Sequence, residues 1–229
     1  MTRSAFLRAR RPEHKQQRRE AILAAARDCA RASGVRAVSL GAVAEAAGIA
    51  KSNIARYFGT REEIYLELLT EEWQRWARAV APRLRAAHGT TEAMTALAET
   101  LVDQPLFCDL LSHVSTSLEH NVSAPAARTF KYALHDNVAA MGAELASVTD
   151  LNDREGGELV AMAAGLAGNL YRAANPPPVL AQVYAEDPEL AAARPALLPT
   201  LVRALSALAA GLPTLRNGSV LNAGEGYLV

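Results

Sequence analysis

The chain has 229 residues, half of them hydrophobic and 21% charged, with 24 basic and 24 acidic side chains. This composition is typical of a globular protein and excludes a fully disordered chain, and two cysteines are too few for a disulfide framework or a four-cysteine zinc site. No apolar run approaches the roughly 20 residues of a membrane span, and the N-terminus lacks the apolar stretch of a signal peptide. We therefore expect a cytoplasmic protein without membrane contact.

The zero net charge conceals two unlike segments. Residues 1–61 carry thirteen basic and four acidic side chains, a net of +9, and residues 62–229 carry a net of −9. Such asymmetry is typical of a nucleic-acid-binding module joined to another domain, although a solvated basic face explains the same numbers. The first arginines could form an arm in the DNA minor groove or could contribute only salt-sensitive affinity: Arg3, Arg8, Arg10 and Arg11.

The sequence predicts an all-α fold, because strand patterns are almost absent while apolar residues recur three and four positions apart. In chain order, we expect helices over residues 12–33, 39–48, 51–58, 61–87, 91–102, 105–120, 125–148, 153–174 and 195–212. Pro12 suits the first turn of the first helix, and Gly34 should end it. The 61–87 helix, which Pro82 should kink or shorten, carries one apolar stripe: Tyr65, Leu69, Trp73, Trp76, Val80 and Leu84. Residues 176–188 should be a connection, and residues from Thr214 on a loose tail.

The segment 38–58 reads VSLGAVAEAAGIAKSNIARYF and predicts a helix-turn-helix. Gly48 provides the permissive backbone that the tight turn between the two short helices needs. In this motif the second helix enters the major groove of DNA. Its exposed face should carry Asn53 and Arg56, which suit base edges, and Lys51 and Tyr57, which suit phosphates, with Ser52 beside them.

From about Arg18 to Leu69, the sequence resembles the TetR family of one-component transcriptional regulators. The matching features are the Ser39 cap, the segment 43–49 (VAEAAGI), the Tyr-Phe pair at 57–58 and the segment 60–64 (TREEI). The resemblance implies a three-helix DNA-binding domain over residues 1–61, a helical ligand-binding and dimerisation domain over 62–213 and a tail over 214–229. The full set of expected DNA contacts is then Ser39, Lys51, Ser52, Asn53, Arg56, Tyr57 and Arg61.

The resemblance also implies a function: a homodimer that binds a palindromic double-stranded DNA operator, represses transcription and responds to a small effector. No enzymatic activity, cofactor or metal site is expected. Two departures from the family pattern leave an alternative open. Ala50 replaces the usual capping Ser of the recognition helix, although Ser52 or Asn53 could cap a shorter helix, and Ala55 replaces the usual aromatic residue. The alternative is a protein-interaction or sensor module whose helix-turn-helix no longer binds DNA specifically.

The expected effector is apolar or amphipathic, because ligand pockets are mainly apolar with a few polar groups. The candidate ligand-binding residues are Trp73, Trp76, Phe107, Leu111, His113, Val114, Tyr132, His135 and Asn169. Plain core packing is the alternative for each of them.

The predicted dimer interface rests on two glycines of the 153–174 helix. Each costs about 1 kcal/mol in a helix interior unless it permits close packing. We expect this helix and the 195–212 helix to form a two-fold interface that includes Gly165, Gly168, Leu201, Leu205 and Leu208. Close packing within one chain is the alternative.

Overall fold

The structure is a computed structural model that describes residues 3–216, with side chains from His14 onward except that of Ser115. The described part is helical and contains no strand, so the predicted all-α fold is confirmed. It divides into two compact units. The head unit comprises Met1–Thr70 and His113–Phe130, and the second unit comprises Glu71–Ser112 and Lys131–Val229. The head unit is thus larger than the predicted 1–61 domain.

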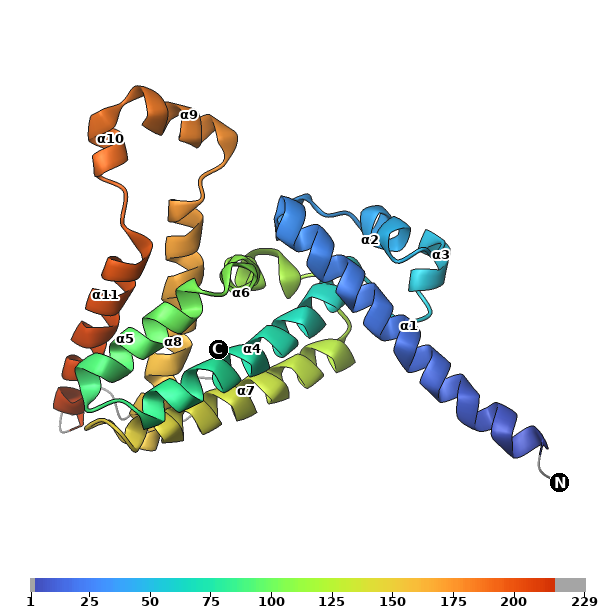
Figure 1. The fold of residues 1–229 in the computed structure, drawn as a ribbon, viewed down its shortest axis with the longest axis horizontal. Coiled ribbons are helices and arrows are strands. Elements are labelled where there is room, and N and C mark those ends of the chain that lie inside the picture. Colours follow the sequence, from blue (N-terminus) through green and yellow to red (C-terminus); the bar gives the residue numbers. More distant parts are fainter. Residues whose placement is uncertain (1–2, 217–229) are drawn as a thin grey trace. The chain divides into compact units, whose positions relative to one another are not determined.

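The head unit is built around a long first helix (Figure 1). Its elements are α1 (Arg3–Ser33), the 3₁₀ turn η1 (Val35–Ala37), α2 (Leu40–Ala46), α3 (Lys51–Ile54), the start of α4 (Arg61–Arg85), the π-helical turn η2 (Val114–Leu118) and the start of α7 (Ala124–Ala146). Helix α1 begins at Arg3, so the expectation that Pro12 starts it is wrong. The predicted 105–120 helix is also wrong, because α6 stops at Leu111 and the chain continues as η2.

Local chemistry explains where the short helices begin and end. Gly34, with φ of +79°, follows the end of α1 as predicted. The Ser39 side chain accepts a hydrogen bond of 3.1 Å from the Ala42 backbone N–H and so caps α2. Gly48 has φ of +64°, which confirms the predicted need for glycine in the turn between α2 and α3. Apolar side chains that meet in the interior hold these helices on α1: Ile22, Leu23, Val43, Ile54, Phe58 and Ile64.

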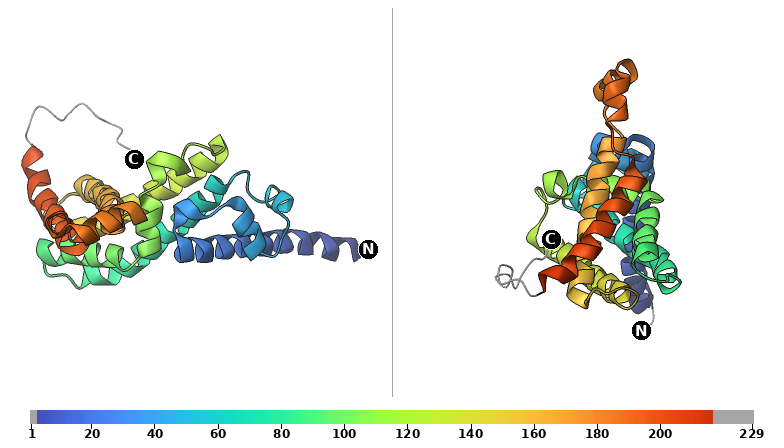
Figure 2. Two further views of the ribbon diagram at one scale, coloured as in Figure 1. Left: turned by 90° about the horizontal axis from the view of Figure 1, so that it is seen from above. Right: turned by 90° about the vertical axis from the view of Figure 1, so that its left-hand side faces the viewer.

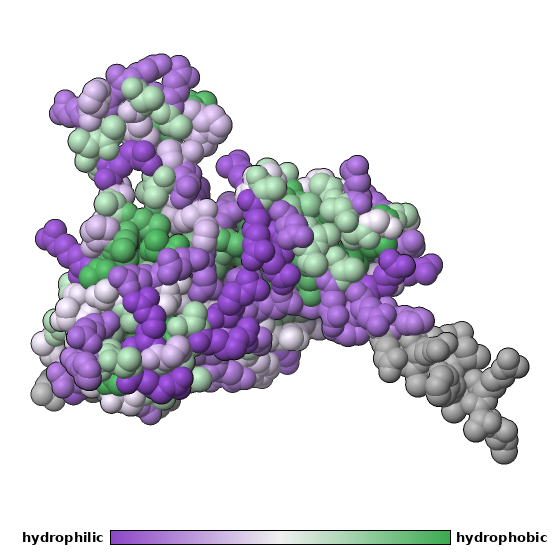
Figure 3. Space-filling view, in the orientation of Figure 1, coloured by the Kyte–Doolittle hydropathy of each residue, from purple (hydrophilic) through white to green (hydrophobic). Residues whose placement is uncertain are grey.

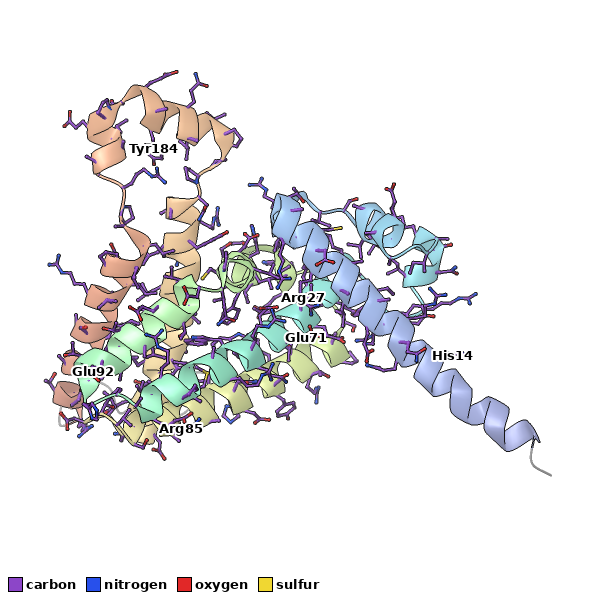
Figure 4. The ribbon with its side chains drawn as sticks, in the orientation of Figure 1. His14, Arg27, Glu71, Arg85, Glu92 and Tyr184 are labelled. Atoms are coloured by element: carbon purple, nitrogen blue, oxygen red, sulfur yellow. The ribbon has the colours of Figure 1, made fainter. Side chains whose placement is uncertain are left out.

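The second unit is a helical bundle. Besides the remainder of α4 and α7, it contains α5 (Thr90–Val102), α6 (Pro105–Leu111), α8 (Asp153–Ala174), α9 (Pro178–Glu186), α10 (Pro188–Ala192), α11 (Leu197–Gly211) and the 3₁₀ turn η3 (Leu212–Leu215). Helix α11 packs against α5 and α8, and α6 packs against α8 (Figures 1 and 2). At the end of α4, Arg85 forms an ion pair of 3.0 Å with Glu144 (Figure 4).

The core of this unit depends on the α4 stripe and on close helix contacts. Trp73, Trp76, Val80 and Leu84 of the stripe lie in this unit, whereas Tyr65 and Leu69 lie in the head unit. All six residues are at most 3% exposed, which confirms the predicted face. Pro82 lies inside α4, and the helix continues past it to Arg85. Helices α7 and α8 approach closely where glycines face each other, because a Cβ added at Gly142 would lie 2.5 Å from the Gly157 nitrogen.

Helices α9 and α10 lie between α8 and α11, where the sequence predicted a connection without naming helices. Neither helix contains a buried residue, and Figure 1 and Figure 2 show them beyond the ends of α8 and α11. Arg194 holds α9 and α10 to the end of α8, since it donates a hydrogen bond of 2.8 Å to the Ala174 carbonyl and lies over the ring of Tyr184, a residue labelled in Figure 4. Proline at the start of each helix and the Asp187 cap explain why both form without burial.

The C-terminal helix is strongly apolar. By length and composition, Leu197–Leu215 could cross a membrane. A single helix of this kind is weak evidence, because helices in soluble cores meet the same criterion. Arg216 donates hydrogen bonds of 2.7 and 2.5 Å to the carboxylate of Glu155, which is buried at the start of α8. Most of the predicted 214–229 tail lies outside the described residues, as do the side chains of the predicted basic arm.

Candidate nucleic-acid interface

Helix α3 presents one polar, exposed face. Ile54 is fully buried, so it fixes the inward side of this short helix. Lys51, Ser52 and Asn53 are exposed, Arg56 is exposed just beyond the helix, and Tyr57 is half-buried. Lys51 and Arg56 form no ion pair with any described residue, so their charges face solvent or a partner.

A neighbouring arginine on α1 anchors the end of this motif. Arg19 donates a hydrogen bond of 2.6 Å to the Tyr57 carbonyl and a second, of 3.0 Å, to Glu67, with which it also forms an ion pair. Its guanidinium lies 4.1 Å from the centroid of the Phe58 ring, within the range of a cation–π contact. These contacts occupy the Arg19 side chain, which therefore holds the residues after α3 against α1 and α4.

Arg61, predicted as a phosphate contact, is occupied within the chain. It donates a hydrogen bond of 2.6 Å to the Val38 carbonyl, another to the Val35 carbonyl and one of 3.1 Å to Glu62. These bonds use all three guanidinium nitrogens, and the side chain is only 19% exposed. Arg61 thus ties the start of α4 to the segment before α2, and we remove it from the expected DNA contacts.

The departures at Ala50 and Ala55 lie at the two ends of α3. Ala50 occupies the N-cap position of α3 and provides no side-chain hydrogen bond. The suggestion that Ser52 or Asn53 caps a shorter helix is wrong, because both lie inside α3. The missing cap costs about 0.5–2 kcal/mol of helix stability, which the buried Ile54 and Phe58 offset.

Within the head unit, the segment before α7 is hydrogen-bonded to the start of α4. Sequence patterns did not reveal this contact. Glu63 accepts a hydrogen bond of 2.7 Å from the Gly59 N–H and bonds of 3.0 and 2.6 Å from the Ser123 N–H and hydroxyl. Burial alone would raise the pKa of the Glu63 carboxyl, but these hydrogen bonds hold the pKa below its ordinary value. Thr60 donates a further bond of 2.7 Å to the Asn121 carbonyl. Contacts some 60 residues apart in sequence leave no periodic signal.

Three predicted ligand-binding residues form an aromatic cluster in the second unit. The ring centroids of Trp73 and Trp76 lie 5.4 Å apart, and that of Phe107 lies 5.3 and 5.8 Å from them. The Trp76 indole N–H donates a hydrogen bond of 3.0 Å to the hydroxyl of Thr100. These side chains are at most 3% exposed, so they pack against one another as core residues do.

The other predicted ligand-binding residues have different surroundings. His113 and Val114 belong to the head unit. Tyr132 is 65% exposed, and His135 and Asn169 are exposed too, so none of these three lines an enclosed cavity formed by the described residues. Leu111 is half-buried at the end of α6, where its Cβ lies against Gly168. A shallow hollow of about 590 Å³ at the α7–α8 junction is lined by other residues: Ala143, Ala146, Ser147, Leu151, Asn152, Asp153 and Arg154.

The predicted dimer residues also separate into two sets. Gly168 is buried against Leu111 at the end of α6 and Ser112 just after it, and Leu201 and Leu205 are fully buried in the core. The alternative of close packing within the chain therefore holds for these three. Gly165 is exposed, and a Cβ added there would meet nothing within 4 Å. Leu208 is half-buried, so both Gly165 and Leu208 remain available to a partner.

Comparison with protein families identifies the class of protein. Residues 22–68 match the family described as bacterial regulatory proteins, tetR family, and residues 70–216 match the family described as tetracyclin repressor-like, C-terminal domain. The second match alone covers more than half of the chain, so the protein belongs to the TetR family of transcriptional regulators.

Solved structures agree with this assignment at the level of the fold. The chain is similar to the fatty acid degradation regulator FadR from Bacillus halodurans, with 16% identity and a TM-score of 0.54 over 85% of this chain and 95% of that one. It is also similar to FadR from Thermus thermophilus, a TetR family transcriptional repressor solved in complex with lauroyl-CoA, with 17% identity and a TM-score of 0.52 over 91% of this chain and 98% of that one. A search of curated protein sequences gave no match.

Proposed function

We propose that this TetR-family regulator is a ligand-responsive repressor that binds a palindromic DNA operator as a homodimer. The observation that carries the proposal is the exposed face of α3, where Lys51, Ser52 and Asn53 point outward and Arg56 follows. A helix of this kind enters the major groove, with polar side chains at base edges and cations at phosphates. The buried Ile54 and the hydrogen bond from Arg19 to the Tyr57 carbonyl hold the opposite side of this segment within the head unit.

The dimer would form through the outer faces of α8 and α11. Only 17% of the apolar window within Leu197–Leu215 is buried in the single chain, which leaves hydrophobic surface for a partner. Figure 3 shows hydrophobic residues gathered over the α8–α11 pair. Met162 and Gly165 on α8 and Val202 and Leu208 on α11 are exposed or half-buried, and we place them in the interface instead of Leu201 and Leu205. In such a dimer, half-sites are read about 34–36 Å apart or at a multiple of that spacing.

The effector would act on the second unit, and we propose an apolar or amphipathic molecule. The Thermus thermophilus regulator was solved with lauroyl-CoA, which makes long-chain acyl compounds the first probes to use. An effector that enters near Trp73, Trp76 and Phe107 must separate rings that now touch, because protein interiors have few voids. Trp73 and Trp76 are the two tryptophans of the chain, so their fluorescence reports entry directly.

The test is a fluorescence anisotropy titration with DNA fragments from either side of the protein's own gene. We expect one fragment to bind selectively over scrambled DNA, with affinity that falls steeply with salt and with two or a multiple of two protomers per site. Equal affinity for scrambled DNA would support the alternative of an interaction module that has lost specific DNA binding. Added lauroyl-CoA that shifts tryptophan emission and releases the fragment would support acyl compounds as the effector class.

A further inference from the structure

A hollow of about 300 Å³ lies in the head unit between α1 and residues 48–57, which we call the recognition segment. Its lining residues are Arg18, Gly48, Ile49, Ala50, Asn53, Arg56 and Tyr57. Two guanidinium groups, an amide and a phenol thus share one concavity, and none of the seven residues is acidic. A wall so rich in hydrogen-bond donors and positive charge suits an anion with several acceptor oxygens.

Some arginines of the head unit are bonded to other groups of the chain, and some are free to bind a partner. Arg19 is held by Glu67, the Tyr57 carbonyl and the Phe58 ring, and Arg61 is held by backbone carbonyls and Glu62. Arg18 and Arg56, in contrast, are exposed and form no hydrogen bond or ion pair with a described residue. Two uncompensated positive charges that border one hollow repel each other, and an anion between them would remove that repulsion.

We propose that this hollow binds a backbone phosphate of the operator, with Arg18 from α1 and Arg56 from the recognition segment donating to its oxygens. The proposal rests on the proposed DNA-binding function and adds a site to it. It makes Arg18 a DNA contact, although it lies about twenty residues before the helix-turn-helix motif in sequence. It also assigns Arg56 to a phosphate instead of a base edge, which leaves base reading to Ser52 and Asn53.

The position of the hollow explains why the anion is a DNA phosphate. The hollow adjoins Ala50, which precedes α3, and Asn53 within α3, so a duplex whose major groove holds α3 brings its backbone to the same place. The Ala50 side chain is a single methyl group, so it leaves the hollow open on this side. Arginine binds phosphate through two parallel N–H···O bonds, and two arginines on opposite sides would fix the register of the duplex against α1.

The experiment compares Arg18→Gln with Arg31→Gln by anisotropy titration of the selected operator fragment at several salt concentrations. Both arginines are exposed on α1, and the substitutions remove the same charge, but thirteen residues place Arg31 about 20 Å further along the helix. We expect Arg18→Gln to weaken operator binding about ten-fold per protomer. The slope of log affinity against log salt should fall by about 0.9 per lost phosphate contact.

Further readouts separate a phosphate contact from other roles. The ratio of operator to scrambled-DNA affinity should stay constant in Arg18→Gln and in Arg56→Gln, because a phosphate carries no base information. Thermal unfolding of Arg18→Gln should match the wild type, since Arg18 forms no hydrogen bond or ion pair with a described residue. If Arg18→Gln and Arg31→Gln behave alike, or if Arg56→Gln changes sequence preference without changing the salt slope, the proposal is overturned.

Two controls locate a failure. A wild-type protein with no preference for any fragment would contradict the proposed function itself, whereas selective wild-type binding that Arg18→Gln leaves intact would overturn only this site. Inorganic phosphate is a further probe of the same hollow. Tight phosphate binding by the wild type, together with unchanged DNA binding by Arg18→Gln, would assign the hollow to a free anion and overturn the proposal.

Discussion

Two glycines three residues apart in α8 should respond in opposite ways to the same substitution. A Cβ added at Gly168 would lie 2.9 Å from the Ser112 nitrogen and 3.0 Å from the Leu111 carbonyl carbon, and backbone atoms cannot rotate away. A Cβ added at Gly165 would meet nothing within 4 Å. The pair therefore separates the intrinsic cost of glycine in a helix from its benefit in close packing.

The magnitudes follow from these contacts. Replacing glycine by alanine in a helix interior gains about 1 kcal/mol, whereas overpacking a filled site costs about 1–3 kcal/mol, and more where backbone must move. Gly165→Ala should raise the free energy of unfolding by about 1 kcal/mol within the single chain. At Gly168 backbone atoms must move, so the upper part of the overpacking range, about 2–3 kcal/mol, applies, and Gly168→Ala should lower the free energy of unfolding by roughly 1–2 kcal/mol after the helix gain is subtracted.

Urea unfolding followed by the fluorescence of Trp73 and Trp76 measures both variants. Several protein concentrations are needed, because the stability of a dimer depends on concentration. If Gly165 lies in the dimer interface, Gly165→Ala should also weaken the dimer in size-exclusion chromatography with light scattering. A Gly168→Ala protein as stable as the wild type would refute the packing argument for α6 and α8.

Three further predictions concern individual side chains. Arg61→Gln removes hydrogen bonds to the Val35 and Val38 carbonyls, so thermal unfolding should show a loss of about 1–3 kcal/mol; unchanged unfolding with weakened DNA binding would return Arg61 to the DNA contacts. Burial raises the pKa of the Cys108 thiol to about 12, so a thiol reagent at pH 8 should modify Cys29 alone in the native protein, and modification of both would contradict this. The hydrogen bond from Arg216, opposed by burial, lowers the pKa of the Glu155 carboxyl. The stabilising contribution of this ion pair is therefore complete above the pKa of about 4.3 in the unfolded chain. It is lost as the pH falls through the lower pKa of the folded protein. Arg216→Gln should reduce the difference in unfolding free energy between pH 7 and pH 3, and an unaltered difference would be evidence against this ion pair.

Features that one helix or one turn determines could be predicted from the sequence. The α4 stripe follows from apolar spacing alone, and every member of it is buried. Gly34 and Gly48 lie where a positive φ is required, and Ser39 caps α2 as its residue type suggests. These features depend on neighbours within a few residues, so the sequence contains the whole interaction.

Features that depend on distant parts of the chain could not be predicted. Arg61 matches a phosphate contact by type and position, but two carbonyls on the preceding segment capture it. Gly165 and Gly168 look equivalent in sequence, and only the arrival of α6 beside one of them distinguishes their roles. Helices α9 and α10 contain no buried residue, so no apolar periodicity in the sequence predicts them. Arg18 lies far from the motif in sequence and reaches it only through the packing of α1.

The central claim is that the exposed face of α3 reads DNA bases, and one ratio tests it most directly. The measurement is the affinity for the selected operator fragment divided by that for scrambled DNA, compared between the wild type and Asn53→Ala, with Arg31→Gln as the control for general charge effects. Because a side-chain contact to a base is worth about 1–3 kcal/mol of discrimination, Asn53→Ala should reduce this ratio roughly 5- to 150-fold while Arg31→Gln leaves it unchanged. A ratio that Asn53→Ala and Ser52→Ala both leave at the wild-type value would contradict the claim.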